Sequence, residues 1–251
     1  MRYHYYKLRH KLIINKAYRE WKLMNNKARE IGMTNTIFNN PSGLDNTDAG
    51  NYSTSYDMAL LTRYAMNYED YRKIVKTKVY KLKTNKNTYV WHNKNKLLSL
   101  DYVTGGKTGY TQKAKRTLVS TASYNNIDLI VVTIKDSDDW NTHESLYEKA
   151  FDEYTAYRVL NRRNFDVVGD NKYQGDFYIE NDVYIPFKNN DSVNLVGKIK
   201  LDGNNNYKNN DKVGEYLIYS DDEFLYKEDI YIKNVKRKKK RLFDVFKENI
   251  L

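Results

Sequence analysis

The chain has 251 residues, of which 40% are hydrophobic and 30% are charged, and this composition excludes both a membrane-spanning bundle and global disorder. Cysteine is absent, which excludes disulfides, thiol catalysis and cysteine-ligated zinc, and the four histidines are too dispersed for a metal-binding motif, so we expect no metal and no cofactor. The formal net charge is +11, but six positive charges lie in the single run Lys236–Arg241, and without a basic face or a reader motif elsewhere we expect no nucleic-acid partner.

The first part of the chain combines a basic segment with a predicted helix. Residues 1–16 are basic and aromatic, and their apolar run from Leu12 to Ile14 is too short for a signal peptide, so we treat them as a leader of unknown role. From Ala17 to Ile31 apolar residues recur at helical spacing, which predicts an amphipathic helix that packs on a core.

Turn, helix and strand signals follow one another through the middle of the chain. Asn39–Gly43 is dense in turn-forming residues. Thr54 and Asp57 have the spacing of a capping box, which predicts a helix from about Ser55 to Ala65. Further along we expect strands and one more helix: Lys78–Thr84 and Thr88–Trp91, then Thr117–Tyr124 and Leu129–Ile134 joined by Asn125-Asn126, then a helix over Asn141–Tyr154. Helices, antiparallel strands and a closing helix indicate an α+β fold.

One glycine-rich segment, Gly105–Thr111, lies between these strands and carries Lys-Thr-Gly, a signature of serine β-lactamases and penicillin-binding proteins. The positive charge of Lys107 suits the docking of a terminal carboxylate, and it also lowers the cost of deprotonating a nearby serine. The Thr108 hydroxyl would donate a hydrogen bond to the same carboxylate. The local sequence leaves one alternative open, which is a tight glycine turn with an exposed lysine.

The same segment has the features of an edge strand that binds an extended substrate. A strand at the rim of a site can pair with such a substrate. Gly106 and Gly109 would let the substrate backbone approach without meeting a Cβ atom. The backbone N–H of Tyr110 is placed to form one half of an oxyanion hole.

Six short blocks occur in order and at natural spacing: Met24–Ala28, Ile31–Met33, Phe38–Asp45, Tyr52–Ala59, Asn95–Leu98 and Gly106–Thr111. Together they resemble the D-alanyl-D-alanine carboxypeptidases, which are S11 serine peptidases and low-molecular-mass penicillin-binding proteins. Asp139–His143 and the helix after it resemble the end of their peptidase domain. The resemblance runs from about Ala17 to Tyr157 and implies a partial penicillin-binding or β-lactamase-like transpeptidase domain.

The resemblance implies a specific reaction and specific site residues. Such enzymes remove the last D-alanine from the peptidoglycan stem pentapeptide through a serine acyl-enzyme, and β-lactams acylate the same serine. Lys107 matches the catalytic lysine of the family's third motif, and Thr108 and Gly109 match its substrate-binding positions. Tyr110 matches the residue whose amide completes the oxyanion hole.

The family's nucleophile motifs are not found in this sequence. No serine is followed by lysine three residues later, and the two Ser-x-Asn sequences, at Ser123 and Ser192, come after Lys-Thr-Gly and are interpreted as chance matches. We therefore expect an N-terminally truncated family member with no nucleophile, inactive by itself and binding β-lactams weakly if at all. We also expect apolar surface where the serine-bearing helix would pack. Because the family uses no histidine base, we expect His92 and His143 to be structural.

The last third of the chain changes character. Short alternating runs separated by Asn, Asp and Gly predict a small all-β sandwich, in the position of the family's accessory domain. The expected runs are Asp176–Phe187, Val193–Leu201, Val213–Tyr219 and Asp229–Ile232. The expected organisation is a leader (1–16), a partial carboxypeptidase domain (17–157), an accessory β domain (158–234) and a basic amphipathic tail (235–251).

The tail joins a basic cluster to an apolar stripe, a combination that favours contact with an anionic membrane surface. We expect that contact from Lys236, Arg237, Lys238, Lys239, Lys240, Arg241, Phe243 and Phe246. The alternative is a solvated basic tail with a packed terminal helix.

The function implied by the resemblance is stem-peptide trimming by a serine-type D-Ala-D-Ala carboxypeptidase at the extracytoplasmic face of the membrane. One alternative is a non-catalytic binder of stem peptides, or a fragment completed by a separate N-terminal piece. The other is a basic protein of membrane surfaces or nucleic acid in which Lys-Thr-Gly is incidental.

Overall fold

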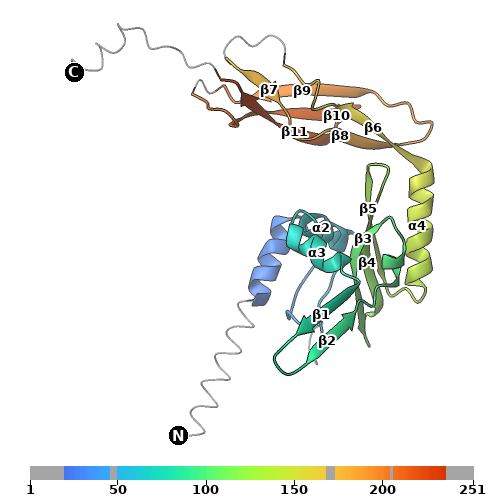
Figure 1. Cartoon of the computed structure of the whole chain (residues 1–251). Coiled ribbons are helices and arrows are strands. Elements are labelled where there is room, and N and C mark those ends of the chain that lie inside the picture. Colours follow the sequence, from blue (N-terminus) through green and yellow to red (C-terminus); the bar gives the residue numbers. More distant parts are fainter. Residues whose placement is uncertain (1–19, 46–49, 168–172, 204–205, 236–251) are drawn as a thin grey trace. The chain divides into compact units, whose positions relative to one another are not determined.

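The computed structural model describes residues 20–45, 50–167, 173–203 and 206–235. The chain divides into two compact units between Glu153 and Tyr154, and each is described by itself (Figure 1). Within the described ranges no helix is both long and apolar enough to cross a membrane. The expected leader and the expected membrane-contacting residues of the tail lie outside the described residues.

The first described element of the first unit is a helix over residues 20–30, as the spacing of apolar residues predicts. Its further elements, in chain order, are α2 (Ser55–Ala65), α3 (Glu69–Lys76), β1 (Val79–Lys83), β2 (Thr88–His92), the short 3-10 helix η1 (Lys96–Ser99), β3 (Val103–Thr111), β4 (Lys115–Tyr124), β5 (Ile127–Ile134) and α4 (Asp139–Glu153).

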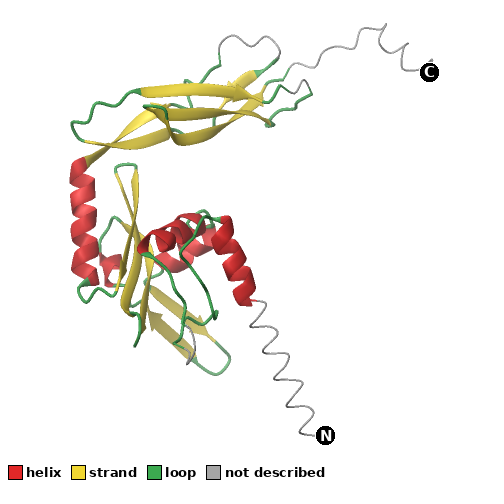
Figure 2. Cartoon of the chain, turned by 180° about the vertical axis from the view of Figure 1, so that it is seen from behind, coloured by secondary structure: helices red, strands yellow, loops and turns green. Residues whose placement is uncertain are grey.

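A three-stranded antiparallel sheet forms the centre of this unit, in the order β3-β4-β5, so β3 is an edge strand. Alternate side chains of each strand point to opposite faces. On one face Leu118 and Ala122 pack with Tyr147 of α4 and with η1, and this cluster is the core of the unit. On the other face α2 contacts β4 and β5, and α3 contacts β3. Figure 2 shows the sheet between α4 and the α2–α3 pair.

Local sequence signals place several of these elements. Thr54 caps α2 by accepting a hydrogen bond from Asp57 N at 3.1 Å, as the spacing predicts. The buried Asp57 carboxylate instead accepts hydrogen bonds from the loop before the helix. The expected hairpin between β4 and β5 is confirmed, because Asn125 and Asn126 have φ values of 48° and 62°, as a two-residue hairpin turn requires.

The second unit consists of two antiparallel sheets. Its strands are β6 (Tyr154–Leu160), β7 (Asp176–Tyr178), β8 (Val183–Lys188), β9 (Leu195–Leu201), β10 (Lys212–Ser220) and β11 (Glu223–Lys233). One sheet has the order β7-β11-β10-β9, and the other pairs β6 with β8. Val183 and Ile185 of β8 pack against Ile218 of β10, so the two sheets share an apolar core and form the expected small sandwich.

Several expected boundaries differ from the structure. The run expected over Asp229–Ile232 is part of the longer strand β11. The expected domain boundary after Tyr157 falls inside β6, because this strand pairs with β8 from Tyr154 onward and therefore belongs to the second unit. For the same reason the helix expected to reach Tyr154 ends at Glu153. The run expected as a single strand over Asp176–Phe187 is divided into β7 and β8, which lie in different sheets.

Candidate active site

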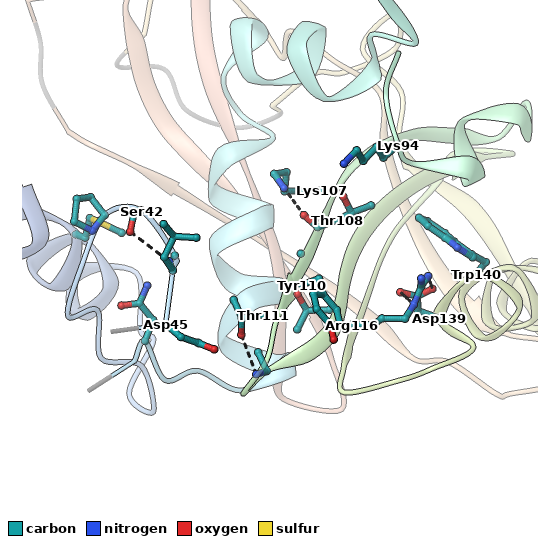
Figure 3. Close-up of a pocket in the computed structure, with 18 of the residues that line it drawn as sticks. Ser42, Asp45, Lys94, Lys107, Thr108, Tyr110, Thr111, Arg116, Asp139 and Trp140 are labelled. Carbon is teal, nitrogen blue, oxygen red and sulfur yellow. Dashed lines mark hydrogen bonds and ion pairs between the residues drawn. The ribbon is translucent and has the colours of Figure 1, made fainter. Parts of the chain in front are cut away.

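The Lys-Thr-Gly segment lies on the edge strand β3, as expected for a strand that binds an extended substrate. Lys107 is paired with Val119 of β4. The segment borders a cavity of about 970 Å³ (Figure 3). Lys107, Thr108, Gly109 and Tyr110 all line this cavity, so the structure brings together the four site residues that the sequence indicates on this strand.

Lys107 and Thr108 present hydrogen-bond donors beside the cavity. The Lys107 side chain is exposed, and its ammonium donates a hydrogen bond to the Thr108 carbonyl oxygen of its own strand. Among the described residues, no carboxylate pairs with this ammonium and the Thr108 hydroxyl has no hydrogen-bond partner. Both donors are therefore available to an anionic group placed in the cavity.

Gly106 and Gly109 have a different structural role from the one expected. A Cβ atom on Gly106 would lie 2.5 Å from the Val119 carbonyl oxygen and 2.9 Å from Asn95 Nδ2, and a Cβ atom on Gly109 would lie 2.5 Å from Thr117 Oγ1. Both missing side chains face neighbouring protein atoms. Close packing of β3 against β4 and Asn95 therefore explains these glycines, and the interpretation that they clear space for a substrate is wrong.

The loop Pro41–Asp45 forms a second wall of the cavity. Asn40 holds the loop in shape, because its Oδ1 accepts hydrogen bonds from Gly43 N at 2.8 Å and from the Ser42 hydroxyl at 3.0 Å. Asn51 Oδ1 in turn accepts a hydrogen bond from Asn40 N at 3.1 Å. The turn chemistry of this segment therefore positions one wall of the cavity.

Two hydrogen-bonded links connect this loop and the segment before it to distant parts of the unit. Asp45 Oδ2 accepts a hydrogen bond from Lys113 N at 3.0 Å, which joins the loop to the turn between β3 and β4. Asn25, on the helix over residues 20–30, accepts a hydrogen bond from Phe38 N at 2.9 Å and donates one to Phe38 O at 2.6 Å. Blocks that are far apart in the sequence therefore meet around one cavity.

An ion pair with an aromatic neighbour forms a further part of the lining. Arg116 Nε lies 3.2 Å from Asp139 Oδ2, and its Nη2 contacts the other carboxylate oxygen, so the pairing is bidentate. Asp139 is buried, and the Arg116 guanidinium lies 5.3 Å from the centre of the Trp140 ring. The carboxylate raises the pKa of Arg116 and neutralises its charge locally.

The remaining charge of the cavity is positive. Lys94, Lys96 and Lys107 line it, and Asp45 is the acidic lining residue left after the Arg116–Asp139 pair is set aside. This balance favours an anionic ligand. Sequence reasoning did not identify Lys94, Lys96 and Arg116 as site residues. The available signal was position: Lys96 lies in the block Asn95–Leu98, which carries part of the resemblance, and Lys94 directly precedes it.

His143 is structural, as expected. It lies on α4 and is fully buried, with Nδ1 2.7 Å from the Ser120 hydroxyl and Nε2 3.0 Å from the Thr133 hydroxyl. Burial lowers its pKa to about 4. His92 is exposed at the end of β2, so the expectation of a packed histidine is wrong there. Ser123 lies on β4 outside the lining of the cavity, and Ser192 lies in the other unit.

A second, apolar cavity of about 710 Å³ adjoins the first on the α2 side of the sheet. Met58 and Leu61 of α2 line it together with Val119 and Val132 of the sheet. Lys107 also lines it, so one lysine borders both cavities. This groove agrees with the expectation of an apolar surface beside the Lys-Thr-Gly strand.

The chain is similar to proteins of cell-wall metabolism. Residues 20–138 match the family model described as D-alanyl-D-alanine carboxypeptidase, peptidase S11. The chain is 35% identical over 146 residues to the D-alanyl-D-alanine carboxypeptidase DacF of Bacillus subtilis, an alignment that covers 56% of this chain and 37% of DacF.

Solved structures of the same class have a similar fold. A D-alanyl-D-alanine carboxypeptidase from Mycobacterium tuberculosis superimposes with a TM-score of 0.50 at 27% identity, over 53% of each chain. A peptidoglycan synthesis regulatory factor (PBP3) from Streptococcus pneumoniae superimposes with a TM-score of 0.69 over 86% of this chain and 69% of that chain. At 16% identity, the second likeness concerns the fold alone.

An edge strand bearing Lys-Thr-Gly beside a positively charged cavity, in a sheet with helices on both faces, defines a partial penicillin-binding fold. More narrowly, residues 20–138 match the model of the D-alanyl-D-alanine carboxypeptidase family, peptidase S11. The chain spans 37% of the length of DacF and 53% of the length of a D-alanyl-D-alanine endopeptidase from Haemophilus influenzae.

Proposed function

We propose that this chain acts in peptidoglycan metabolism, as the part of a serine-type D-Ala-D-Ala carboxypeptidase site that binds the carboxylate of the substrate. One observation carries the proposal: Lys107 and Thr108 line one cavity from one edge strand, and both have donors available to an anion. The family whose model residues 20–138 match supplies the substrate class. The proposed ligand is a stem peptide that ends in D-Ala-D-Ala.

The chemistry of the residues gives each a role in this proposal. The Lys107 ammonium and the Thr108 hydroxyl bind the carboxylate of the terminal D-alanine by charge-assisted hydrogen bonds. The stem peptide adds to the open edge of β3 as an extended strand. The Tyr110 N–H stabilises the oxyanion that forms when a serine attacks the carbonyl of the penultimate residue. No residue of this chain is assigned to that serine.

Binding to a peptide acid and to its amide tests this function. We expect an acylated peptide ending in D-Ala-D-Ala to bind at least tenfold more tightly than the same peptide with a C-terminal amide. A hydrogen bond to a charged group contributes about 1.5–3 kcal/mol, and about 1.4 kcal/mol corresponds to a tenfold change in affinity. Isothermal titration calorimetry gives both constants, and equal affinities would reject the assignment of the cavity to a carboxylate.

Labelling with a fluorescent penicillin distinguishes a catalytic carboxypeptidase from a unit that only binds stem peptides. A label that survives denaturing electrophoresis shows that a serine within these residues forms an acyl-enzyme. Selective binding of the peptide acid without a covalent label favours the second candidate function, a stem-peptide-binding unit completed by a separate polypeptide. The apolar cavity that Lys107 also borders favours this candidate, because a further segment could fill it.

The apolar cavity predicts that the isolated chain binds hydrophobic dyes. Met58, Leu61, Val119 and Val132 line a groove of about 710 Å³ that no described side chain fills. We expect 1-anilinonaphthalene-8-sulfonate fluorescence to rise with the native chain, and to fall by at least half in the variant Val119→Thr/Val132→Thr. The exposed pair Val79→Thr/Val90→Thr on the β1–β2 hairpin is the matched control. Cooperative thermal unfolding with no dye signal would contradict this prediction.

The proposed location follows from the same chemistry. Stem peptides lie on the extracytoplasmic side of the cell membrane, so we propose that the chain is located there. Its sequence supports contact with anionic lipid through the basic tail that begins at Lys236, because polybasic segments next to apolar stripes bind such surfaces.

A further inference from the structure

The hairpin of β1 and β2 has an aromatic face that no other part of the described chain covers. In the register of the pair, Tyr80 lies opposite Trp91 and Leu82 lies opposite Tyr89, so these four side chains share one face of the ribbon. Their exposed fractions are 57%, 50%, 40% and 43%, in that order. Figure 1 shows the ribbon extending away from the three-stranded sheet.

The rings of this aromatic face form an ordered row. The Tyr80 and Trp91 ring centres are 6.0 Å apart with planes 17° from parallel, and the Tyr89 and Trp91 centres are 5.6 Å apart with planes 6° from parallel. Exposed apolar surface of this kind marks a binding surface when it is contiguous. Two tyrosine hydroxyls and the indole N–H also place hydrogen-bonding groups among the ring surfaces.

The hairpin and its flanks are strongly basic. Residues 71–100 contain eight lysines, one arginine and no acidic residue. Lys81 and Lys83 lie on the ribbon face opposite the rings, and Lys86 lies in the turn. Lys94 and Lys96 follow β2 directly and line the candidate active site. Lysines therefore occur both on the hairpin and at the cavity, and this positive charge favours an anionic polymer that contacts both.

The shape of the hairpin distinguishes between the occupants that fit this chemistry. A membrane-inserting hairpin needs an apolar tip, whereas the turn here is Thr84-Asn85-Lys86-Asn87 and the rings lie on one flank of the strands. A second copy of the ribbon would bring like charges together. A glycan strand has apolar C–H faces that pack on aromatic rings, and in peptidoglycan it carries stem peptides with free carboxylates.

We propose that the aromatic face of the β1–β2 hairpin binds the glycan strand of peptidoglycan, while the lysines around it attract the carboxylates of its stem peptides. This inference rests on the proposed function, because the polymer supplies the peptide that enters the cavity beside Lys107. It makes polymeric peptidoglycan, rather than a free peptide, the substrate class of the site. The hairpin then holds the polymer close to the edge strand.

Co-sedimentation of the full chain with purified, insoluble peptidoglycan tests the proposal. We expect binding to peptidoglycan stripped of covalently attached polymers, and an affinity at least tenfold lower for Tyr80→Ser/Trp91→Ser. The matched variant Val79→Thr/Val90→Thr removes apolar surface from the opposite face and should bind like wild type. Adding Tyr80→Ser/Trp91→Ser to Lys107→Gln should lower the affinity at least tenfold relative to Lys107→Gln alone, so loss of the proposed carboxylate site and loss of the hairpin site give different results.

A second measurement is needed because Tyr80→Ser/Trp91→Ser could unfold the hairpin and lose binding for that reason. Soluble glycan fragments should change the tryptophan fluorescence of the wild-type chain, and Trp91→Phe should remove most of this change although Trp21 and Trp140 remain. Equal sedimentation of wild type and Tyr80→Ser/Trp91→Ser would overturn the proposal.

Four other results would also overturn it, each by identifying a different occupant. Binding only to cell walls that keep their covalently attached polymers would identify those polymers as the ligand. Hairpin-dependent binding to phosphatidylglycerol vesicles or to oligo-dT would identify a membrane or a nucleic acid, and hairpin-dependent dimerisation in analytical ultracentrifugation would identify a second copy of the chain.

Discussion

Replacing Lys107 by glutamine should abolish the preference of the chain for a peptide acid over its amide. The Lys107 ammonium lines the cavity with no carboxylate partner among the described residues, so its charge is available to the ligand. Glutamine keeps a hydrogen-bond donor and most of the length of the side chain but removes the charge. We expect affinity for the peptide acid to fall about 10- to 100-fold, the equivalent of about 1.5–3 kcal/mol, with little change for the amide.

The control for this variant is Lys149→Gln on α4. Lys149 is exposed, lies 3.8 Å from Glu153 and does not line the cavity, so its substitution changes the net charge by the same amount without touching the site. Calorimetric titration of both peptides into the wild-type chain and into each variant completes a thermodynamic cycle between the side chain and the peptide carboxylate. If Lys107→Gln and Lys149→Gln weaken binding of the acid equally, the effect is one of overall charge, and the assigned role of Lys107 fails.

The parts of the site that could be predicted from sequence are those set by local chemistry. Thr54 and Asp57 specify the start of α2 within four residues, and Asn125-Asn126 specify a hairpin turn because both tolerate positive φ. Lys107 and Thr108 were identifiable because their neighbours form a contiguous motif on one strand. In each case the residues that determine the structure are adjacent in the sequence.

The parts that could not be predicted depend on contacts between distant segments. Asn95 and Val119 approach Gly106 only after β3 pairs with β4, so sequence alone could not show which atoms a Cβ would meet. The pairing of Arg116 with Asp139 spans the whole of β5. The strand β6 was missed because it follows α4 without a turn, and only its pairing with β8 defines it.

The same limit applies to the buried polar network between α4 and the sheet. Ser120 Oγ lies 2.7 Å from His143 Nδ1 and 2.7 Å from the Tyr147 hydroxyl, and all three residues are fully buried. His143 could be interpreted as structural from the sequence, because no catalytic role was implied for it, but its hydroxyl partners Ser120 of β4 and Thr133 of β5 could not be identified. These partners matter because two hydroxyl groups can hydrogen-bond both nitrogens of a neutral imidazole. They supply no negative charge that would stabilise a buried imidazolium.

Acid should therefore destabilise the first unit through His143. Burial lowers the pKa of His143 from its ordinary 6.5 to about 4, against the smaller opposing effects of Asp139 and Asp136. Between these two values the unfolded state binds a proton that the folded state does not, so the unfolding free energy falls as the pH falls. The contribution is fully present above about pH 6.5, and about 3 kcal/mol of it should be lost between pH 7 and pH 4.

Urea unfolding of His143→Gln at a series of pH values measures this contribution. All three tryptophans lie in the first unit, so tryptophan fluorescence reports the unfolding of that unit. We expect the variant to be less stable at pH 7, because its amide cannot reproduce both hydrogen bonds, but to lose about 3 kcal/mol less than wild type on acidification to pH 4. His92→Gln, at an exposed site, should keep the wild-type slope. Parallel pH profiles for wild type and His143→Gln would show that carboxylates, and not the buried imidazole, control acid unfolding.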